Sequence, residues 1–274
     1  MGTKSSRARR VAPTSSRRQE LLREKVAIVT GAATGIGRAI AHALAREGAA
    51  IVADYVGSAD IVDSVCQEIR SFGGKAMSVP ADVSDPTEVQ KLVAAACEAY
   101  GKLDILVNNA GIEHKMPFLE TPLGVFEKIV DVNLKGVWLC SQFAGRKMAE
   151  QKSGGRIINI SSIHEDVTMP TNAAYCATKG GVRMLMRTVA VELAAYDITV
   201  NNVAPGAIDT PMDAEVRADP EQYESLLSQI PMRRMGKPEE VAAVCVFLAS
   251  DAASYVSGAT YYVDGAMSLQ AGSL

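Results

Sequence analysis

Short apolar runs rich in β-branched residues alternate with longer amphipathic segments along most of this chain. Such runs have the length and composition of buried strands. We predict strands at residues 26–30, 50–54, 75–80, 105–108, 156–160, 199–203 and 260–263, and helices at 59–72, 86–100, 126–150 and 177–196. This alternation predicts an α/β fold: a single doubly wound Rossmann-type domain, with a parallel sheet of about seven strands and helices on both faces.

The 274-residue chain has an ordinary globular composition, with 48% hydrophobic and 22% charged residues. That is ample for one α/β domain, which we place at residues 24–274. Residues 1–23 are predicted to be a disordered basic extension, with an Arg-rich targeting presequence as the alternative. Prolines and charges break the periodicity of residues 209–236. We interpret that stretch as a helical substrate flap, with plain surface structure as the alternative.

Charge is divided unevenly along the chain. The first 24 residues contain seven Lys or Arg and two Glu, so a net charge of −3 for the whole leaves −8 on the remainder. An acidic body argues against nucleic-acid binding. No apolar run is long enough to span a membrane. Five cysteines are scattered without a C-x-x-C pair, which fits a cytoplasmic enzyme with reduced thiols and no metal site.

The first predicted strand runs into the turn Thr30-Gly-Ala-Ala-Thr-Gly-Ile-Gly37, and helix-forming residues follow. A dinucleotide phosphate site needs this context, because glycines let the backbone approach the pyrophosphate and a helix N-terminus presents free N–H groups. The spacing is T-G-x-x-x-G-I-G rather than G-x-G-x-x-G, and a glycine turn without a ligand is the alternative. The turn residues predicted to bind the cofactor are Gly31, Thr34, Gly35, Ile36 and Gly37.

Tyr175 and Lys179 are four residues apart, so on a helix they share one face, about 6 Å apart along the axis. A fixed cation beside a phenol favours the phenolate, which suits a general acid/base for interconverting an alcohol and a carbonyl. Taken alone, the pair could equally be an ordinary helical contact.

Several polar residues and turns follow the ends of predicted strands. The glycine turn, Asp82, Asn109, Ser162 and Pro205 all occupy such positions. Ligands of open parallel sheets bind outside the carboxyl ends of the strands. We therefore expect one site at this edge of the sheet.

Together these motifs resemble those of the short-chain dehydrogenase/reductase family. The chain contains, in the order of that family, T-G-x-x-x-G-I-G, Asn-Asn-Ala-Gly at 108–111, Asn133, Ser162, Y-x-x-x-K and Pro205-Gly206. The resemblance covers roughly residues 24–270. Segments 161–165, 205–211, 218–222 and 253–258 are similar to the bacterial glucose 1-dehydrogenase branch of the family.

The resemblance implies four catalytic residues. Tyr175 would move the hydroxyl proton while hydride passes between nicotinamide and the substrate carbon. Lys179 would favour the phenolate and bind the nicotinamide ribose. Ser162, thirteen residues before Tyr175 as in the family, would hold the reacting oxygen. Asn133 would anchor a water that relays protons to Lys179.

The resemblance also implies contacts to the remainder of the cofactor. Asp82 and Val83 would meet the adenine, although Asp82 could instead cap the helix after Pro86, a role that Ser84 or Asp85 would fill better. Thr210 would bind the carboxamide. Beyond the glycine turn, the implied cofactor residues are Asp54, Tyr55, Asp82, Val83, Asn109, Ala110, Gly111, Tyr175, Lys179, Pro205, Gly206, Ile208 and Thr210.

The cofactor is expected to be NAD(P), with a preference for NAD; use of both cofactors, through Ser58 and backbone groups, is the alternative. Asp54 at the end of the second strand could hold the ribose 2′-hydroxyl and repel a 2′-phosphate. However, Asp54 lies one position before the usual acidic position, which Tyr55 occupies. Val56 stands where glucose dehydrogenases that use both cofactors often carry Arg, and Thr34 is not basic, so two phosphate clamps are missing.

The predicted substrate residues are Ser162, Tyr175, Glu113 and His164. Glu165 lies in the same segment as His164, and polar groups there suit a polyhydroxylated substrate, since each sugar hydroxyl needs partners. Ordinary loop hydrogen bonds are the alternative for these residues.

The leading prediction is a glucose 1-dehydrogenase-like oxidation of a small-molecule sugar. The alternative within the family is a reductase of 3-oxoacyl thioesters or small ketones, for which Arg217, Arg233, Arg234 and Lys237 could attract an acidic carrier protein. A non-catalytic dinucleotide-sensing protein is a more distant alternative. The apolar stretches 177–196 and 255–263 predict a homotetramer.

Overall fold

The computed structural model describes residues 20–211 and 214–270. Their core is one parallel sheet in the order β3-β2-β1-β4-β5-β6-β7, which confirms the predicted Rossmann-type α/β fold. The order reverses between β1 and β4, which makes that point the topological switch of the sheet. The strands are β1 (Val26–Val29), β2 (Ala50–Tyr55), β3 (Lys75–Pro80), β4 (Ile105–Asn108), β5 (Gly155–Ile160), β6 (Ile198–Pro205) and β7 (Thr260–Val263).

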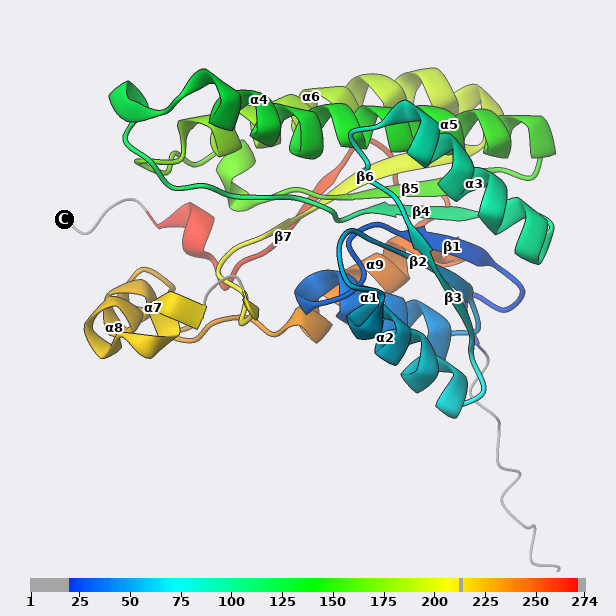
Figure 1. The fold of residues 1–274 in the computed structure, drawn as a ribbon, viewed down its shortest axis with the longest axis horizontal. Coiled ribbons are helices and arrows are strands. Elements are labelled where there is room, and N and C mark those ends of the chain that lie inside the picture. Colours follow the sequence, from blue (N-terminus) through cyan, green and yellow to red (C-terminus); the bar gives the residue numbers. More distant parts are fainter. Residues whose placement is uncertain (1–19, 212–213, 271–274) are drawn as a thin grey trace, which may run out of the picture.

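Helices cover the sheet on both faces (Figure 1). One layer contains α1 (Gly35–Arg46), α2 (Ala59–Ser71) and α9 (Pro238–Ala249). The other contains α3 (Pro86–Tyr100), α4 (Leu123–Val130), α5 (Gly136–Gln151) and α6 (Ala173–Leu193). Each layer closes its own hydrophobic core against the sheet. In β1, Ala27 and Val29 pack into one core and Ile28 into the other, so the strand reads as continuously apolar.

The helix predicted over residues 126–150 is two helices in the structure. α4 and α5 are joined by a π-helical turn at Asp131–Lys135, and the pair extends from Leu123 to Gln151. π-Helical turns inside helices are frequent at functional sites, and this one contains Asn133.

The helix predicted over residues 177–196 begins earlier, at Ala173, so Tyr175 lies in its first turn. It ends at Leu193 and is followed by a 3₁₀ turn at Ala194–Tyr196. Asp197 then adopts a left-handed conformation with φ of 57°, which stops further helical extension.

The region predicted as a flap holds two short helices, α7 (Ala214–Ala218) and α8 (Pro220–Ser228). They stand beside the sheet rather than on either face of it (Figure 1). Asp219 caps α8 by accepting hydrogen bonds from the N–H groups of Glu221 and Gln222. Their role as a substrate flap stays a prediction.

Most of the predicted N-terminal extension, residues 1–19, lies outside the described residues. Residues 20–23 were also assigned to that extension, but they belong to the folded domain. Leu22 is fully buried in the core, and its N–H donates to the Glu47 carbonyl at 2.7 Å. The domain therefore begins earlier than residue 24, because one apolar side chain anchors a segment whose overall composition is charged.

Candidate active site

A pocket of about 740 Å³ opens at the carboxyl ends of β1, β4, β5 and β6. It brings together most of the predicted site residues, from turns that are far apart in the sequence. Those that line it are Gly31, Thr34, Gly35, Ile36, Gly37, Tyr55, Asn109, Ala110, Gly111, Glu113, Ser162, His164, Tyr175, Lys179, Pro205, Gly206, Ile208 and Thr210. This arrangement fits the expectation of one site at the carboxyl edge of the sheet.

The glycine turn leaves its backbone open on the pocket side. Gly31 and Gly35 have φ values of 61° and 54°, a region that favours glycine. A Cβ added at Gly37 would lie 2.2 Å from the Gly31 carbonyl oxygen, so only glycine fits there. α1 starts within this turn at Gly35. An open backbone followed by a helix N-terminus is the arrangement that accepts a pyrophosphate.

Asn109 joins the turn after β4 to the glycine turn after β1. Its Nδ2 donates to the carbonyls of Thr30 at 2.9 Å and Gly31 at 3.0 Å. In return, the Thr30 hydroxyl oxygen accepts from the N–H groups of Asn109 and Ala110 at 2.9 and 3.0 Å. Four hydrogen bonds therefore fix the two loops against each other across the switch point.

Tyr175 and Lys179 share one face of α6, as predicted, and both line the pocket. Lys179 is buried, its Nζ donates to the Ile160 carbonyl at 3.0 Å, and the same atom lies 5.3 Å from the centre of the Tyr175 ring. Burial lowers the pKa of Lys179 to about 8, while the charges of Glu165 and Glu113 oppose that fall. A cation this close to the phenol favours its ionised form.

Ser162 begins the 3₁₀ turn Ile163–Glu165 after β5, and its Oγ accepts from the His164 N–H at 3.2 Å. The His164 ring lies edge-on to the Tyr175 ring, with the ring centres 6.3 Å apart. Its Nδ1 lies 3.0 Å from the Val167 carbonyl oxygen, a contact that orients the imidazole. The hydroxyl of Ser162, the imidazole and the phenol thus border the same end of the pocket.

Asn133 is buried in the π-helical turn behind the pocket. Its side chain forms hydrogen bonds to both backbone groups of Ile112, and its Nδ2 lies 3.5 Å from the Thr178 hydroxyl. That hydroxyl in turn donates to the Tyr175 carbonyl at 2.7 Å. Asn133 therefore connects the turn after β4 to the first turns of α6.

Asp54, expected at the cofactor ribose, is not among the described residues that line the pocket. It is only 1% exposed, and its Oδ2 accepts from the Gly31 N–H at 3.3 Å. Burial raises the pKa of Asp54 to about 7, although hydrogen bonds from backbone N–H groups partly offset that rise. The Asp54 carboxyl group thus binds the backbone of the glycine turn on the side away from the pocket. Tyr55 and the exposed Val56 line the pocket at the end of β2.

Asp82 and Val83 are likewise absent from the described residues that line the pocket. Asp82 accepts from the N–H and the hydroxyl of Ser84 at 2.9 and 2.6 Å. Asp85 is the N-cap of α3, accepting from the N–H groups of Thr87 and Glu88. This confirms that Asp82 does not cap the helix, and it leaves the adenine contact a prediction.

Glu113, a predicted substrate residue, lines the pocket together with residues that sequence reasoning did not identify. Glu113 accepts from the Asn172 amide at 2.7 Å and lies 3.4 Å from the Lys115 ammonium. Lys115, Met169, Val216, Leu226 and Met267 complete the wall. Val216 and Leu226 belong to the predicted flap, but Lys115, Met169 and Met267 had no signal in the sequence, because their place depends on how distant segments meet.

Glu165, expected beside the substrate, is buried and is not among the described residues that line the pocket. The turn Ile163–Glu165 points its side chain to β6 and β7, where Asn202 and Thr260 bind it. The direction of a side chain in a 3₁₀ turn does not follow from the sequence.

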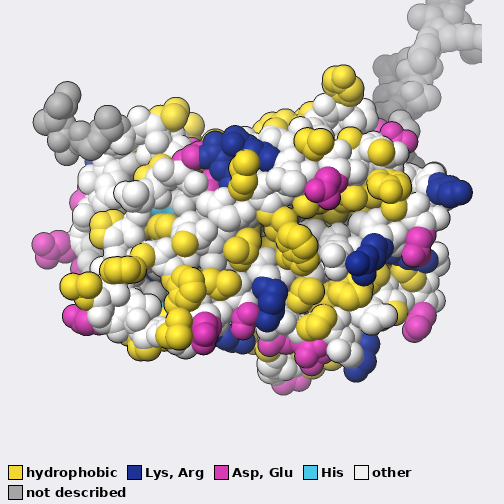
Figure 2. Space-filling view, turned by 90° about the horizontal axis from the view of Figure 1, so that it is seen from above, with side chains coloured by type: hydrophobic (Ala, Val, Ile, Leu, Met, Phe, Trp, Pro, Cys, Tyr) yellow, Lys and Arg dark blue, Asp and Glu magenta, His cyan; other side chains and the backbone are white. Residues whose placement is uncertain are grey.

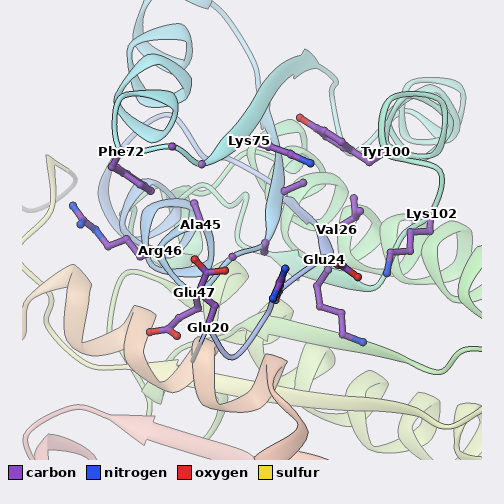
Figure 3. Close-up of a pocket in the computed structure, with 17 residues that line it drawn as sticks. Glu20, Glu24, Val26, Ala45, Arg46, Glu47, Phe72, Lys75, Tyr100 and Lys102 are labelled. Carbon is purple, nitrogen blue, oxygen red and sulfur yellow. The ribbon is translucent and has the colours of Figure 1, made fainter. Parts of the chain in front are cut away.

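A second hollow, of about 960 Å³, lies at the opposite edge of the sheet, around the amino ends of β1, β2 and β3 (Figure 3). Its wall carries charges of both signs, including Glu20, Glu24, Glu47, Lys25, Lys75 and Lys102. It contains none of the predicted site residues among those that line it. The carboxyl edge is therefore the candidate active site.

Within residues 20–211 and 214–270, no group of three or more His, Cys, Asp or Glu side chains is arranged to hold a metal ion. Over the same ranges, no helix has the length and apolar character needed to cross a membrane.

A family model described as enoyl-(acyl carrier protein) reductase matches residues 31–268, which is most of the chain. The chain belongs to the short-chain dehydrogenase/reductase family. Membership confirms the resemblance that the motifs carry. The glycine turn, whose close packing leaves no room for a Cβ at Gly37, fits the dinucleotide that this family uses.

Curated relatives of similar identity have different names. The chain is 44% identical to an L-rhamnose 1-dehydrogenase (NAD(P)⁺) of Azotobacter vinelandii, over 90% of this chain and 98% of the relative. It is 44% identical to a 3-oxoacyl-[acyl-carrier-protein] reductase of Synechocystis, with the same two coverages. It is 40% identical to glucose 1-dehydrogenase 2 of Bacillus subtilis, over 89% of this chain and 95% of the relative.

Solved structures agree with this family. One is described as a candidate NAD(P)-dependent gluconate 5-dehydrogenase from Beutenbergia cavernae with bound NADP. It superposes with a TM-score of 0.86 at 39% identity, covering 92% of this chain and 100% of that one. The chain is therefore an NAD(P)-dependent oxidoreductase that acts on CH–OH or carbonyl groups, and its similarity to the glucose dehydrogenase branch is confirmed.

Proposed function

We propose that this enzyme oxidises the C1 hydroxyl of an aldose, such as D-glucose or a related sugar, to a lactone. The observation that carries the proposal is the polar wall beside Tyr175, where Glu113 and His164 face the pocket from two different loops. A polyhydroxylated ring needs several donors and acceptors around the reacting carbon. Two of the relatives named above are sugar 1-dehydrogenases.

In this reaction Tyr175 accepts the proton of the C1 hydroxyl as general base, and Lys179 favours the required phenolate. Ser162 donates a hydrogen bond to the reacting oxygen and fixes its position. The bound nicotinamide supplies the hydride acceptor. Asn133 holds the Ile112 turn and provides the anchor for a proton-relaying water. General acid–base assistance of this kind contributes roughly 10² to 10⁴-fold to the rate.

Reduction of a 3-oxoacyl thioester is the second candidate, since one of the relatives has that activity by name. It would call for free cations near the entrance to bind an acidic carrier protein. Two of the four basic residues considered for this role are already neutralised. Arg217 pairs with Asp209, and the two terminal guanidinium nitrogens of Arg234 contact Glu240 at 2.6–2.7 Å. This pairing favours the sugar.

We infer that NAD is preferred to NADP. With Asp54 buried under the glycine turn, the pocket offers Tyr55 and Val56 at the end of β2, and neither carries a charge. Thr34 in the glycine turn is also uncharged. A 2′-phosphate would therefore lack the guanidinium that binds it bidentately.

We propose that the enzyme assembles as a homotetramer. Exposed apolar side chains gather over the face formed by α4, α5 and α6 (Figure 2), among them Trp138, Met184 and Val191. A second exposed group surrounds β7, with Tyr255 and Tyr262. Two separate apolar faces on one chain suit two different two-fold interfaces, which together generate a tetramer.

We propose a cytoplasmic location. All five cysteines are free thiols, and three of them are buried. Burial raises the pKa of the Cys140 and Cys245 thiols, which makes them unreactive packing groups suited to a reducing compartment.

The substrate assignment is tested by a spectrophotometric panel. Aldoses, simple alcohols, steroids and 3-oxoacyl esters are assayed with both NAD(H) and NADP(H), and kcat/KM is compared. The proposal expects the highest value for an aldose. Reduction of an oxoacyl thioester or simple ketone, with no aldose turned over at tens of millimolar, would favour the second candidate. His164→Ala and Glu113→Ala should raise KM for the sugar, and an unchanged KM would remove those two contacts from the account.

A further inference from the structure

Glu165 is a charged residue with no exposed side-chain surface, two positions after Ile163 in the turn that Ser162 opens. Both of its carboxylate oxygens accept hydrogen bonds. Oε2 accepts from the Asn202 amide in β6 at 3.0 Å, and Oε1 accepts from the Thr260 hydroxyl in β7 at 2.7 Å. The turn that positions Ser162 is thereby tied to two strands of the sheet.

Arg183 brings a positive charge to the same carboxylate. Its Nε lies 3.6 Å from Glu165 Oε1, and its guanidinium also pairs with Asp166, which accepts from the Tyr262 hydroxyl. Arg183 follows Lys179 by one helical turn, so Tyr175, Lys179 and Arg183 form one row along α6. Asn202 and Thr260 therefore donate hydrogen bonds to the Glu165 carboxylate, and the charge of Arg183 lies beside it.

Glu165 also terminates a row of buried asparagines that crosses the sheet. Asn108, Asn159 and Asn202 are neighbours in register on β4, β5 and β6. Asn108 donates to Asn159 at 2.8 Å, Asn159 donates to Asn202 at 3.0 Å, and Asn202 donates to Glu165. This row lies immediately below the strand ends that carry Asn109 and Ser162. Each asparagine amide in this row donates a hydrogen bond to the next residue. The Glu165 carboxylate can only accept hydrogen bonds, so the row ends there.

We propose that Glu165 is a positioning residue for the Tyr175–Lys179 pair: its buried carboxylate fixes the Ser162 turn against β6 and β7 and supplies the negative charge opposite the Lys179 ammonium. The inference rests on the proposed acid–base chemistry at Tyr175. Glu165 acts through Lys179 and Ser162 and does not itself face the pocket.

The electrostatic part of this role has a definite sign. Glu165 and Glu113 are the charges that raise the pKa of Lys179 against the effect of burial. Other charged or titratable groups on the described elements around Glu165 are His164 and Asp166 beside it, Arg183 and Arg187 on α6, and Tyr262 and Asp264 at β7. Without Glu165, Lys179 would lose its proton at lower pH, and the cation that favours the Tyr175 phenolate would be lost with it.

The test compares the pH dependence of kcat in wild type, Glu165→Gln and a control, Glu192→Gln, which changes an exposed carboxylate on α6, the helix that carries Lys179. Glutamine keeps the size of the side chain and removes the charge. We expect the alkaline limb of the profile to move down by about one pH unit in Glu165→Gln, the usual scale for one nearby charge, and to stay in place in the control. An equal profile in all three proteins, even with lower thermal stability of Glu165→Gln, overturns the inference.

Arg183→Met provides a second variant in case Glu165→Gln does not fold. It removes the positive charge 3.6 Å from Glu165 Oε1, so the negative charge of Glu165 acts on Lys179 with less compensation and the alkaline limb should move to higher pH. A limb that stays in place or moves down overturns the inference. If wild type has no NAD(P)-linked activity, the proposed function itself is wrong. If wild type is active but the alkaline limb of the pH profile does not move in the variants, only the role of Glu165 is refuted.

Discussion

Asn133 binds Ile112 through both atoms of its side-chain amide. Its Oδ1 accepts from the Ile112 N–H, and its Nδ2 donates to the Ile112 carbonyl, each at 2.8 Å. The two bonds resemble one step of a strand ladder formed by a side chain. They require the amide to project from the junction between α4 and α5, where the π-helical turn lies. One side chain therefore links the π-helical turn to the Ile112 segment that lines the pocket.

Replacing Asn133 with Asp tests this relationship. The substitution removes the donor and places a carboxylate oxygen against the Ile112 carbonyl, leaving a part-buried acceptor unpaired. We expect the free energy of unfolding to fall by about 1–3 kcal/mol, and kcat to fall with it. Urea denaturation measures the first, with Asn133→Ser as a neutral comparison that also removes the bonds. A loss of stability below about 0.5 kcal/mol in both variants would contradict the structural role.

Cofactor preference is tested at Val56, which is exposed and lines the pocket at the end of β2. Wild type should show a higher kcat/KM with NAD than with NADP. Val56→Arg should improve the use of NADP, because a guanidinium pairs with a 2′-phosphate bidentately. Val56→Leu is the matched control and should leave the ratio unchanged. A wild-type preference for NADP would refute the NAD assignment.

The buried Asp54 predicts a pH-dependent stability. Burial raises the pKa of Asp54 in the folded protein to about 7, from 3.8 for an unperturbed aspartate. Between about pH 4 and pH 7, the folded protein therefore keeps a proton that the unfolded chain releases, so this residue lowers stability as pH rises. Asp54→Asn should gain stability over wild type at pH 8 relative to pH 5. Asp251→Asn, at an exposed carboxylate, is the control. A difference between Asp54→Asn and wild type that does not change with pH would contradict the burial argument.

Assembly is tested at Val191, which is 78% exposed on α6 although it is β-branched and apolar. Light scattering should give a tetramer mass for wild type at micromolar concentration. Val191→Glu should reduce that mass, because burying a carboxylate in an apolar interface is costly. Val191→Thr, which keeps the shape, should not. A monomer mass for wild type would refute the proposed assembly.

Much of the fold could be predicted because its signals are local. All seven strands were expected at nearly their observed positions, since β1 and its neighbours are buried on both faces and are apolar without interruption. The glycine turn could also be predicted from its sequence pattern. Glycine is required at position 37, because any side chain there would collide with the Gly31 carbonyl oxygen.

Other features depend on contacts that no local pattern encodes. Asp54 was expected at the cofactor ribose and Glu165 beside the substrate, but the structure directs their carboxylates to the Gly31 N–H and the Asn202 amide. The contribution of Leu226 to the pocket wall depends on how the flap folds back. Leu22 is buried in the core, although the segment around it is mostly charged and was predicted to be disordered. In each case a long-range contact, rather than a propensity, decides the outcome.

The most direct test of the account is turnover by Tyr175→Phe, with the aldose that wild type uses best. Absorbance of NADH gives the rate, and quenching of protein fluorescence gives the affinity for NADH. The account predicts that the rate falls at least about 100-fold, as expected for the loss of a general acid/base, while NADH binds as in wild type. A variant that keeps more than about a hundredth of the wild-type rate would contradict proton transfer through Tyr175.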